Sequence, residues 1–133
     1  MLQNLLHNYY KLLIGYYLMK HQMRLNESPF DRIKSGKKII EIRLFDEKRQ
    51  GLNLGNVIEF SKLPKLDERL EVQVTGLLRY QTFTELVNDF PMNSFGYPND
   101  YDKSRFVEQI YEIYTKEEEQ RYGVLGIKIK LIK

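Results

Sequence analysis

The chain has 133 residues, a net charge of +3 and an ordinary balance of 42% apolar and 29% charged residues, which suits one folded domain and excludes a disordered chain. It contains no cysteine, which excludes disulfides, zinc knuckles and thiol nucleophiles and favours a reducing cytoplasm. With His7 and His21 as the only histidines, neither a histidine-rich metal site nor a His-based triad is expected, and no cofactor is predicted.

Residues 1–18 are rich in leucine and tyrosine, and their apolar side chains recur at the helical spacing of three and four. This segment is too short and too polar for a membrane span, and it lacks the basic start and cleavage site of a signal peptide. Two interpretations remain: an amphipathic helix that docks on the domain or on a partner, or sequence upstream of a true start at Met19. We therefore expect an N-terminal extension over residues 1–18 and a single domain over residues 19–133.

The first part of the domain predicts strand, helix, strand and connection. Residues 21–25 have the composition of a short strand. A helix follows, with Ser28 as its N-cap and Gly36 at its end. The β-branched residues 38–45 predict a second strand, and residues 46–56 predict a polar connection that closes on a turn.

The second part predicts two strands, a helical zone and a last strand. Residues 57–63 and 69–80 form the two strands, and alternation places five apolar side chains of the second one on a single face. These are Leu70, Val72, Val74, Leu78 and Tyr80. Thr82 is expected to cap the first helix, and a second helix is expected to run to Glu119. Residues 123–132 alternate as a half-exposed strand.

This order of elements favours an α+β fold. Strands and helices do not alternate regularly, which argues against a doubly wound parallel sheet. A small, mostly antiparallel barrel with helices closing one side fits better. The two ends of the domain are basic and its middle is acidic, which indicates one positive face if the ends meet in space.

Two charged residues interrupt the strand at residues 38–45. Because side chains alternate along a strand, Glu41 and Arg43 share one face. Their Cα atoms are about 7 Å apart, near enough to pair or to converge on one ligand, and Lys38 stands at the start of the strand. The apolar residues of the other face, expected to fill the barrel core, are Ile40, Ile42 and Leu44.

The order Gly36, Lys38, Glu41 and Arg43 is Gly-x-Lys-x-x-Glu-x-Arg. It resembles the signature of the ASCH domain family, a branch of the PUA-like β-barrel folds, in its small bacterial or archaeal single-domain form. The resemblance covers about residues 19–133. It implies a small barrel with a cleft between barrel and helices, where the motif residues gather, and a role linked to RNA binding and RNA metabolism.

Some small bacterial members of this family are amidohydrolases that remove the acetyl group from acetylcytidine. In them the motif lysine is catalytic, and Lys38 matches that residue. Glu41 stands where those enzymes have a threonine, and a carboxylate and a hydroxyl do different chemistry. If the protein is an enzyme, the resemblance implies that Lys38 and Glu41 are its catalytic residues. The distant glutamate that completes the set is left open among Glu85, Glu108 and Glu112.

The preferred hypothesis is a cleft that binds RNA or a nucleotide through Lys38, Glu41 and Arg43. Arg43 would bind a phosphate or a base edge, and Glu41 would hold Arg43 or accept a base amine. Lys38 would neutralise a phosphate or, in an enzyme, act as base or nucleophile. A small hydrolase acting on a modified nucleoside and a protein-interaction module using residues 1–18 remain as alternatives.

Further ligand contacts are expected from Lys37, Arg49 and Phe30. Lys34 and Lys48 are either solvated loop charges or part of a phosphate-binding patch. Aromatic side chains elsewhere are either core residues or platforms for stacked bases. These are Tyr80, Phe95, Tyr97 and Tyr101, the last three in a loop over residues 91–101 that is expected to be exposed. Residues 115–122 are expected to form a capped, solvated helix end, and a homodimer is a further partner that the sequence leaves open.

Overall fold

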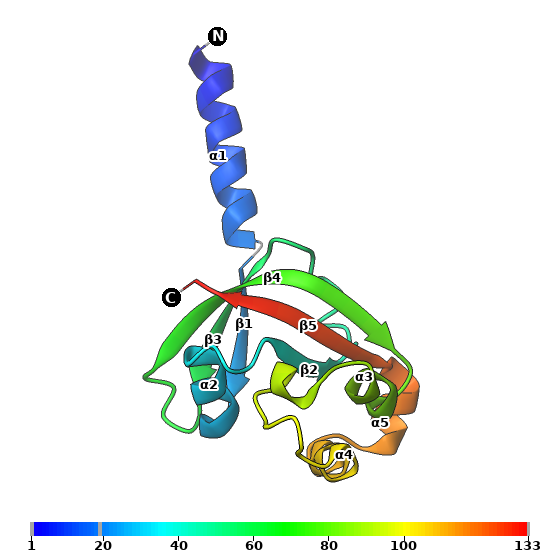
Figure 1. Cartoon of the computed structure of the whole chain (residues 1–133). Helices are drawn as coiled ribbons and strands as arrows, with labels where there is room; N and C mark the ends of the chain where they lie inside the picture. The colour runs from blue at the N-terminus through cyan, green and yellow to red at the C-terminus, as the bar shows by residue number, and fades with distance from the viewer. Residues whose placement is uncertain (1, 19, 133) are drawn as a thin grey trace.

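The computed structural model describes residues 2–18 and 20–132. Five strands form one sheet in the order β1-β3-β4-β5-β2, curled into a half-barrel with β1 (Lys20–Leu25) and β2 (Ile40–Leu44) at its edges (Figure 1). The inner strands are β3 (Val57–Lys62), β4 (Arg69–Tyr80) and β5 (Val124–Leu131). β1 runs parallel to β3 and the other pairs are antiparallel. The α+β fold is confirmed, with a mixed sheet and an open barrel.

After α1 (Leu2–Leu18), which precedes β1, the helices divide into one that follows β1 and a group that follows β4. They are α2 (Glu27–Lys34), α3 (Phe83–Asn88), the 3-10 helix η1 (Met92–Ser94), α4 (Lys103–Tyr111) and α5 (Lys116–Tyr122). α2 packs Phe30 and Ile33 into the barrel core, together with apolar residues of β1, β3, β4 and β5. α3, α4 and η1 build a second apolar cluster with β2.

β2 presents its apolar face to the helices and its charged face to the barrel. Ile40 and Leu44 are buried in the helix-side cluster, with Ile42 packed against it. Glu41 and Arg43 pair in register with Ile127 and Leu125 of β5, two residues of the barrel core. The prediction that the apolar set fills the barrel core is therefore wrong, because this edge strand lies between the two clusters.

A bulge corrects the prediction for β4. The pairing of β4 with β5 shifts register between Val74 and Gly76. Residues 70, 72 and 74 face the barrel core, whereas Leu78 and Tyr80 pack on the helix-side cluster. One extra residue in a strand moves all later side chains to the other face. The alternation of side chains counted from Leu70 therefore gives the wrong face for residues beyond the bulge.

The helix ends follow the capping chemistry of the sequence with two corrections. Thr82 caps α3 as predicted, since its side chain accepts from the backbone of Glu85. The N-cap of α2 is Asn26 instead of Ser28. The helix that was predicted to run to Glu119 is divided into α4 and α5, because Thr115 forms a capping box at which α5 begins.

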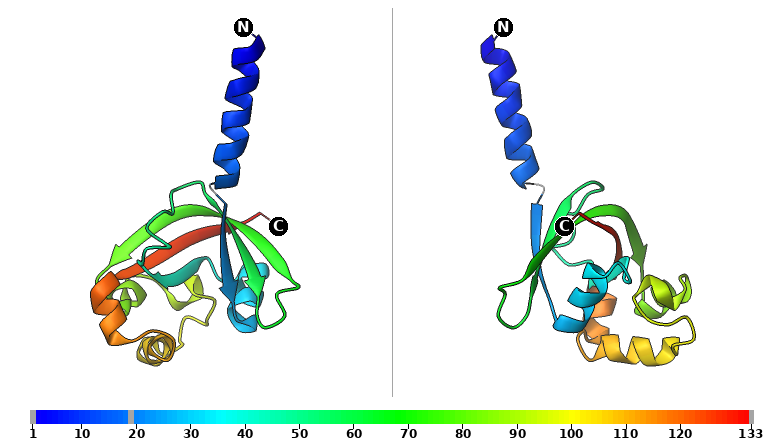
Figure 2. Two further views of the ribbon diagram at one scale, coloured as in Figure 1. Left: turned by 180° about the vertical axis from the view of Figure 1, so that it is seen from behind. Right: turned by 60° about the vertical axis from the view of Figure 1, so that its left-hand side comes forward.

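α1 (Leu2–Leu18) projects from the half-barrel in all three views (Figures 1 and 2). Residues 2–10 are exposed, so this part of the helix does not dock on the domain as one interpretation expected. Met19, the suggested alternative start, lies outside the described residues. In the chain as described, no helix has the length and apolar character needed to cross a membrane.

Glu119 departs from the expected solvated helix end. It is buried, and its carboxylate accepts hydrogen bonds from the backbone N–H of Phe83 and the hydroxyl of Tyr111, each at 2.8 Å. Burial together with the bond to this carboxylate raises the pKa of Tyr111 to about 12. Glu119 thus joins α5 to the start of α3 and to the end of α4.

The substitution Glu119→Ala should lower the free energy of unfolding by about 2 kcal/mol, because it leaves a buried backbone N–H without an acceptor. Urea denaturation followed by circular dichroism measures the change. Glu117→Ala is the matched control: Glu117 is exposed on the same helix, and its loss should cost less than ~0.5 kcal/mol. Equal effects from the two substitutions would contradict a joining role for Glu119.

Candidate ligand pocket

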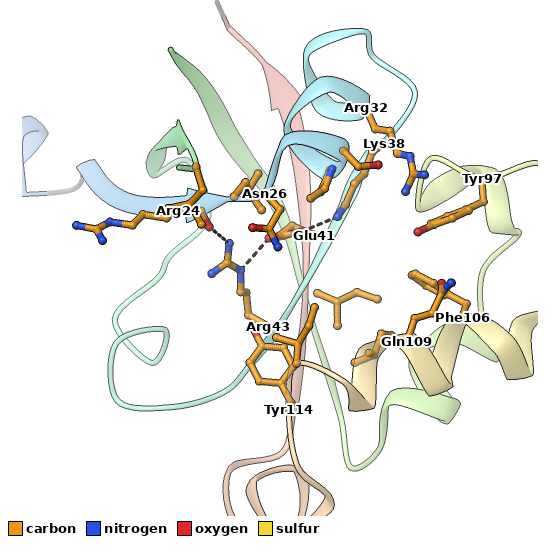
Figure 3. Close-up of a pocket in the computed structure, with 17 residues that line it drawn as sticks. Arg24, Asn26, Arg32, Lys38, Glu41, Arg43, Tyr97, Phe106, Gln109 and Tyr114 are labelled. Atoms are coloured by element: carbon orange, nitrogen blue, oxygen red, sulfur yellow. Dashed lines mark hydrogen bonds and ion pairs between the residues drawn. The ribbon is translucent and has the colours of Figure 1, made fainter. Parts of the chain in front are cut away.

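A pocket of about 380 Å³ opens between the edge strands β1 and β2, α2 and α4. We call it the Lys38 pocket (Figure 3). Its charged, amide and serine side chains are those of Arg24, Asn26, Ser28, Arg32, Lys38, Glu41, Arg43 and Gln109. The remainder is largely apolar, with Ile42, Ile113 and Tyr114 among the side chains that complete it. A volume of this size lies in the range of small-ligand sites, roughly 300–1,000 Å³.

One ion-pair network organises the pocket (Figure 3). The two oxygens of Glu41 accept separately from Lys38 Nζ at 2.7 Å and from Arg43 Nε at 2.8 Å. Arg43 Nη2 also donates to the backbone carbonyl of Arg24 at 2.9 Å. Since Arg43 belongs to β2 and Arg24 to β1, this guanidinium links the two unpaired edges of the sheet.

Glu41 is a buried carboxylate, 3% exposed, that stays ionised. Burial alone would raise its pKa, but the positive charges of Lys38 and Arg43 and their hydrogen bonds outweigh burial and lower the pKa to about 2. For Arg43, burial acts to lower the pKa, and the neighbouring Glu41 more than offsets it and raises the pKa. This arrangement fits the predicted role in which Glu41 holds Arg43, since both of its oxygens are already engaged.

The pocket carries a surplus of positive charge. Lys38, Arg43 and Arg32 all line it, and Glu41 is the sole carboxylate among the described residues that do so. Arg24 supplies its carbonyl, while its guanidinium points away from the pocket (Figure 3). Such a surplus suits an anionic ligand. Within the described chain, no three acidic or histidine side chains are grouped so that they could share a metal ion.

The structure separates the other predicted contacts from this pocket. Lys37 lines a different hollow beside Gly36, and Arg49 lines a groove on the far side of Arg43. The prediction that Phe30 contacts the ligand is wrong: its side chain is 0% exposed because the apolar face of α2 turns into the barrel core. The three candidate glutamates are all exposed, and none lines the Lys38 pocket. They are Glu85, Glu108 and Glu112.

The aromatic residues are mostly occupied within the protein. Phe95 is buried, so it offers no free face to a base, and the loop around it is less exposed than predicted. Tyr97 lines the pocket, but the Arg32 guanidinium covers its ring at 4.0 Å and the ring of Tyr101 lies 4.6 Å away. Tyr80 lies outside the pocket lining and donates its hydroxyl to Asp89.

Gly96 is a supporting residue that the sequence analysis missed. Its φ of +87° lies in the left-handed region, and a Cβ there would come within 2.9 Å of Arg32 Cδ and 3.1 Å of Lys38 Cβ. The neighbouring residue Phe95 forms an isolated bridge with Lys38. Glycine therefore lets this loop approach the pocket closely. Its place between two aromatics in a Pro- and Asn-rich loop was the only signal in the sequence.

A family model and several solved structures are similar to the chain. The model of the ASCH domain matches residues 23–133. The crystal structure of hypothetical protein PH0355 is 34% identical with a TM-score of 0.74, over 85% of this chain and 99% of that one. The solution structure of protein PF0455 from Pyrococcus furiosus is 30% identical with a TM-score of 0.68, over 86% and 98% of the two chains.

A third structure, an ASCH protein from Zymomonas mobilis, shares the fold at 13% identity. Its TM-score is 0.57, and the match covers 84% of this chain and 67% of that one. No curated protein is significantly similar to the chain in sequence.

The stability supplied by Glu41 should depend on pH. Its pKa falls from 4.5 in the unfolded reference to about 2 in the folded state. The contribution, about 3 kcal/mol, is therefore fully present above pH 4.5 and lost as the pH falls toward 2. The unfolding free energies of wild type and Glu41→Gln should converge over this interval. A difference that stays constant from pH 6 to pH 2 would contradict the ion-pair network, and Glu47→Gln, an exposed carboxylate, serves as control.

Gly96→Ala should lower the free energy of unfolding by at least ~1 kcal/mol, because a side chain is strained at positive φ. Gly51→Ala is its matched control, since a Cβ at Gly51 meets nothing within 4 Å and its φ is not positive. Chemical denaturation of both variants distinguishes them. Equal stability of the two would show that the loop does not depend on glycine at residue 96.

Proposed function

The chain belongs to the ASCH domain family, and from this premise we propose that it binds RNA or a nucleotide in the Lys38 pocket. The observation that carries the proposal is the charge arrangement of the pocket. Three cationic side chains, Lys38, Arg43 and Arg32, line the pocket together with one carboxylate among the described residues, and that carboxylate is buried and already engaged by the first two. An anionic ligand would neutralise the positive charge of the pocket that Glu41 alone does not compensate.

The cationic side chains retain unused donors for a phosphate. Lys38 gives one hydrogen bond to Glu41, and an ammonium group has three donors. Arg32 packs its guanidinium on Tyr97 and makes no ion pair within the described chain. A phosphate placed between these two side chains would receive charge-assisted hydrogen bonds from both.

The rest of the pocket suits the apolar faces of a nucleoside. Ile42, Ile113 and Tyr114 line the pocket together with the charged side chains. Asn26 and Gln109 add neutral hydrogen-bonding groups to the lining. Asn and Gln side chains present both donors and acceptors, which is the chemistry that base edges require. Together these residues offer an apolar wall and polar groups around a phosphate site.

The hydrolase alternative receives no comparable support from the geometry. It requires a second carboxylate near Lys38, and none of the three glutamates considered in the sequence lines the pocket. From α4, the helix that carries Glu108, the pocket lining receives the amide of Gln109 and no carboxylate. Deacylation is therefore an alternative outcome of the binding experiment.

Isothermal titration calorimetry of the full chain with the four ribonucleoside 5′-monophosphates measures the binding affinity and tests the proposal. Lys38→Ala should weaken the binding by about 10- to 100-fold, because charge-assisted hydrogen bonds contribute ~1.5–3 kcal/mol each. Arg32→Gln, which leaves the Glu41 network intact, should also weaken it. Lys37→Ala is the matched control, an adjacent exposed lysine outside the pocket.

Binding that is absent in wild type, or equal in Lys38→Ala, Arg32→Gln and Lys37→Ala, would refute the proposal. A parallel incubation with N4-acetylcytidine detects free acetate. Product formed by wild type and lost in Lys38→Ala would replace the binding function with the hydrolase alternative.

A further inference from the structure

A second cavity lies on the other side of Arg43. It has a volume of about 660 Å³ and is lined by His21, Gln22, Met23, Arg24, Arg43, Lys48 and Arg49. We call it the basic groove. Arg24 and Arg43 line both this groove and the Lys38 pocket, so the two cavities meet at the guanidinium that joins the sheet edges.

The lining of the basic groove is strongly cationic. Arg24, Arg43, Lys48 and Arg49 contribute four positive charges, and no described carboxylate lines it. Arg49 is anchored by Asp46, with Nη1 2.9 Å from the carboxylate, whereas Lys48 is exposed and makes no ion pair in the part of the chain that the structure describes. The groove therefore holds more positive charge than its own side chains neutralise.

Two observations indicate that the groove extends the Lys38 pocket. The guanidinium of Arg24 points away from the pocket (Figure 3), yet Arg24 lines the groove. Arg43 uses Nε and Nη2 in its bonds to Glu41 and Arg24, which leaves Nη1 without a partner among the described residues. An anion at the junction would meet donors from both residues.

We propose that the basic groove binds the phosphate backbone of a single-stranded polynucleotide whose neighbouring nucleotide occupies the Lys38 pocket. This inference rests on the proposed function and specifies its ligand as a chain of several nucleotides. A single nucleotide would fill only the pocket. A cationic groove that continues from the pocket is typical of proteins that bind the phosphate backbone of a longer chain. The described lining of the groove contains no Phe or Tyr ring on which a base could stack, so we expect its main contacts to be those of its four cations with phosphates.

The test compares a mononucleotide with a hexanucleotide of the same base, the base being the one bound most tightly in the mononucleotide titrations. Wild type should bind the hexanucleotide more tightly than the mononucleotide. Lys48→Gln should weaken hexanucleotide binding about three- to fivefold and reduce the slope of log K against log salt by about 0.7, the effect of one lost phosphate contact. Mononucleotide binding should stay within a factor of two.

Two further variants sharpen the test. Lys48→Gln combined with Arg49→Gln should weaken hexanucleotide binding roughly tenfold, because two cations of the groove are then lost. Lys130→Gln removes the same charge from an exposed position of β5 that lines neither cavity, and it should leave both affinities unchanged.

The outcomes separate this inference from the proposed function. Mononucleotide binding without any gain for the hexanucleotide would overturn the inference and leave the function standing. A gain that survives the double substitution, or that Lys130→Gln reduces equally, would also overturn it. Failure of wild type to bind either ligand would refute both. A length-dependent gain that only the groove variants reduce is the result expected.

Discussion

The guanidinium of Arg43 holds together two strand edges that have no backbone pairing with each other. A sheet ordered β1-β3-β4-β5-β2 leaves the outer sides of β1 and β2 open, and such edges are usually covered or blunted. Arg43 crosses from β2 to the carbonyl of Arg24 on β1, and Glu41 fixes its orientation. The Lys38 pocket lies on one side of this crossing and the basic groove on the other.

Stability alone is a weak reason to keep this network. Desolvating an ion pair costs several kcal/mol per ion, and apolar residues of similar volume often stabilise a protein as well or better. What the network supplies is position: the buried carboxylate of Glu41 fixes two cations in the lining of the Lys38 pocket. A chain with a net charge of only +3 thereby concentrates positive charge where two cavities meet, which supports the proposed binding of a nucleic acid chain.

The sequence predicted the strand that carries the site better than the surroundings of that strand. Alternation along β2 placed Glu41 and Arg43 on one face, and the structure confirms that they pair. The family resemblance is likewise confirmed. Phe30 was misjudged because helical periodicity does not tell which neighbour the apolar face of α2 meets. The bulge in β4 and the approach of Gly96 to Lys38 depend on contacts between distant segments, which no local pattern contains.

The most direct test of the account is a map of amide chemical-shift changes in the ¹⁵N-labelled chain during titration with single-stranded RNA. Binding across the Lys38 pocket and the basic groove should centre the changes on Lys38, Arg43 and Gly96 and spread them along β1 to His21. Changes confined to α1 or to the outer face of β5, with the amides around Arg43 unmoved, would contradict it.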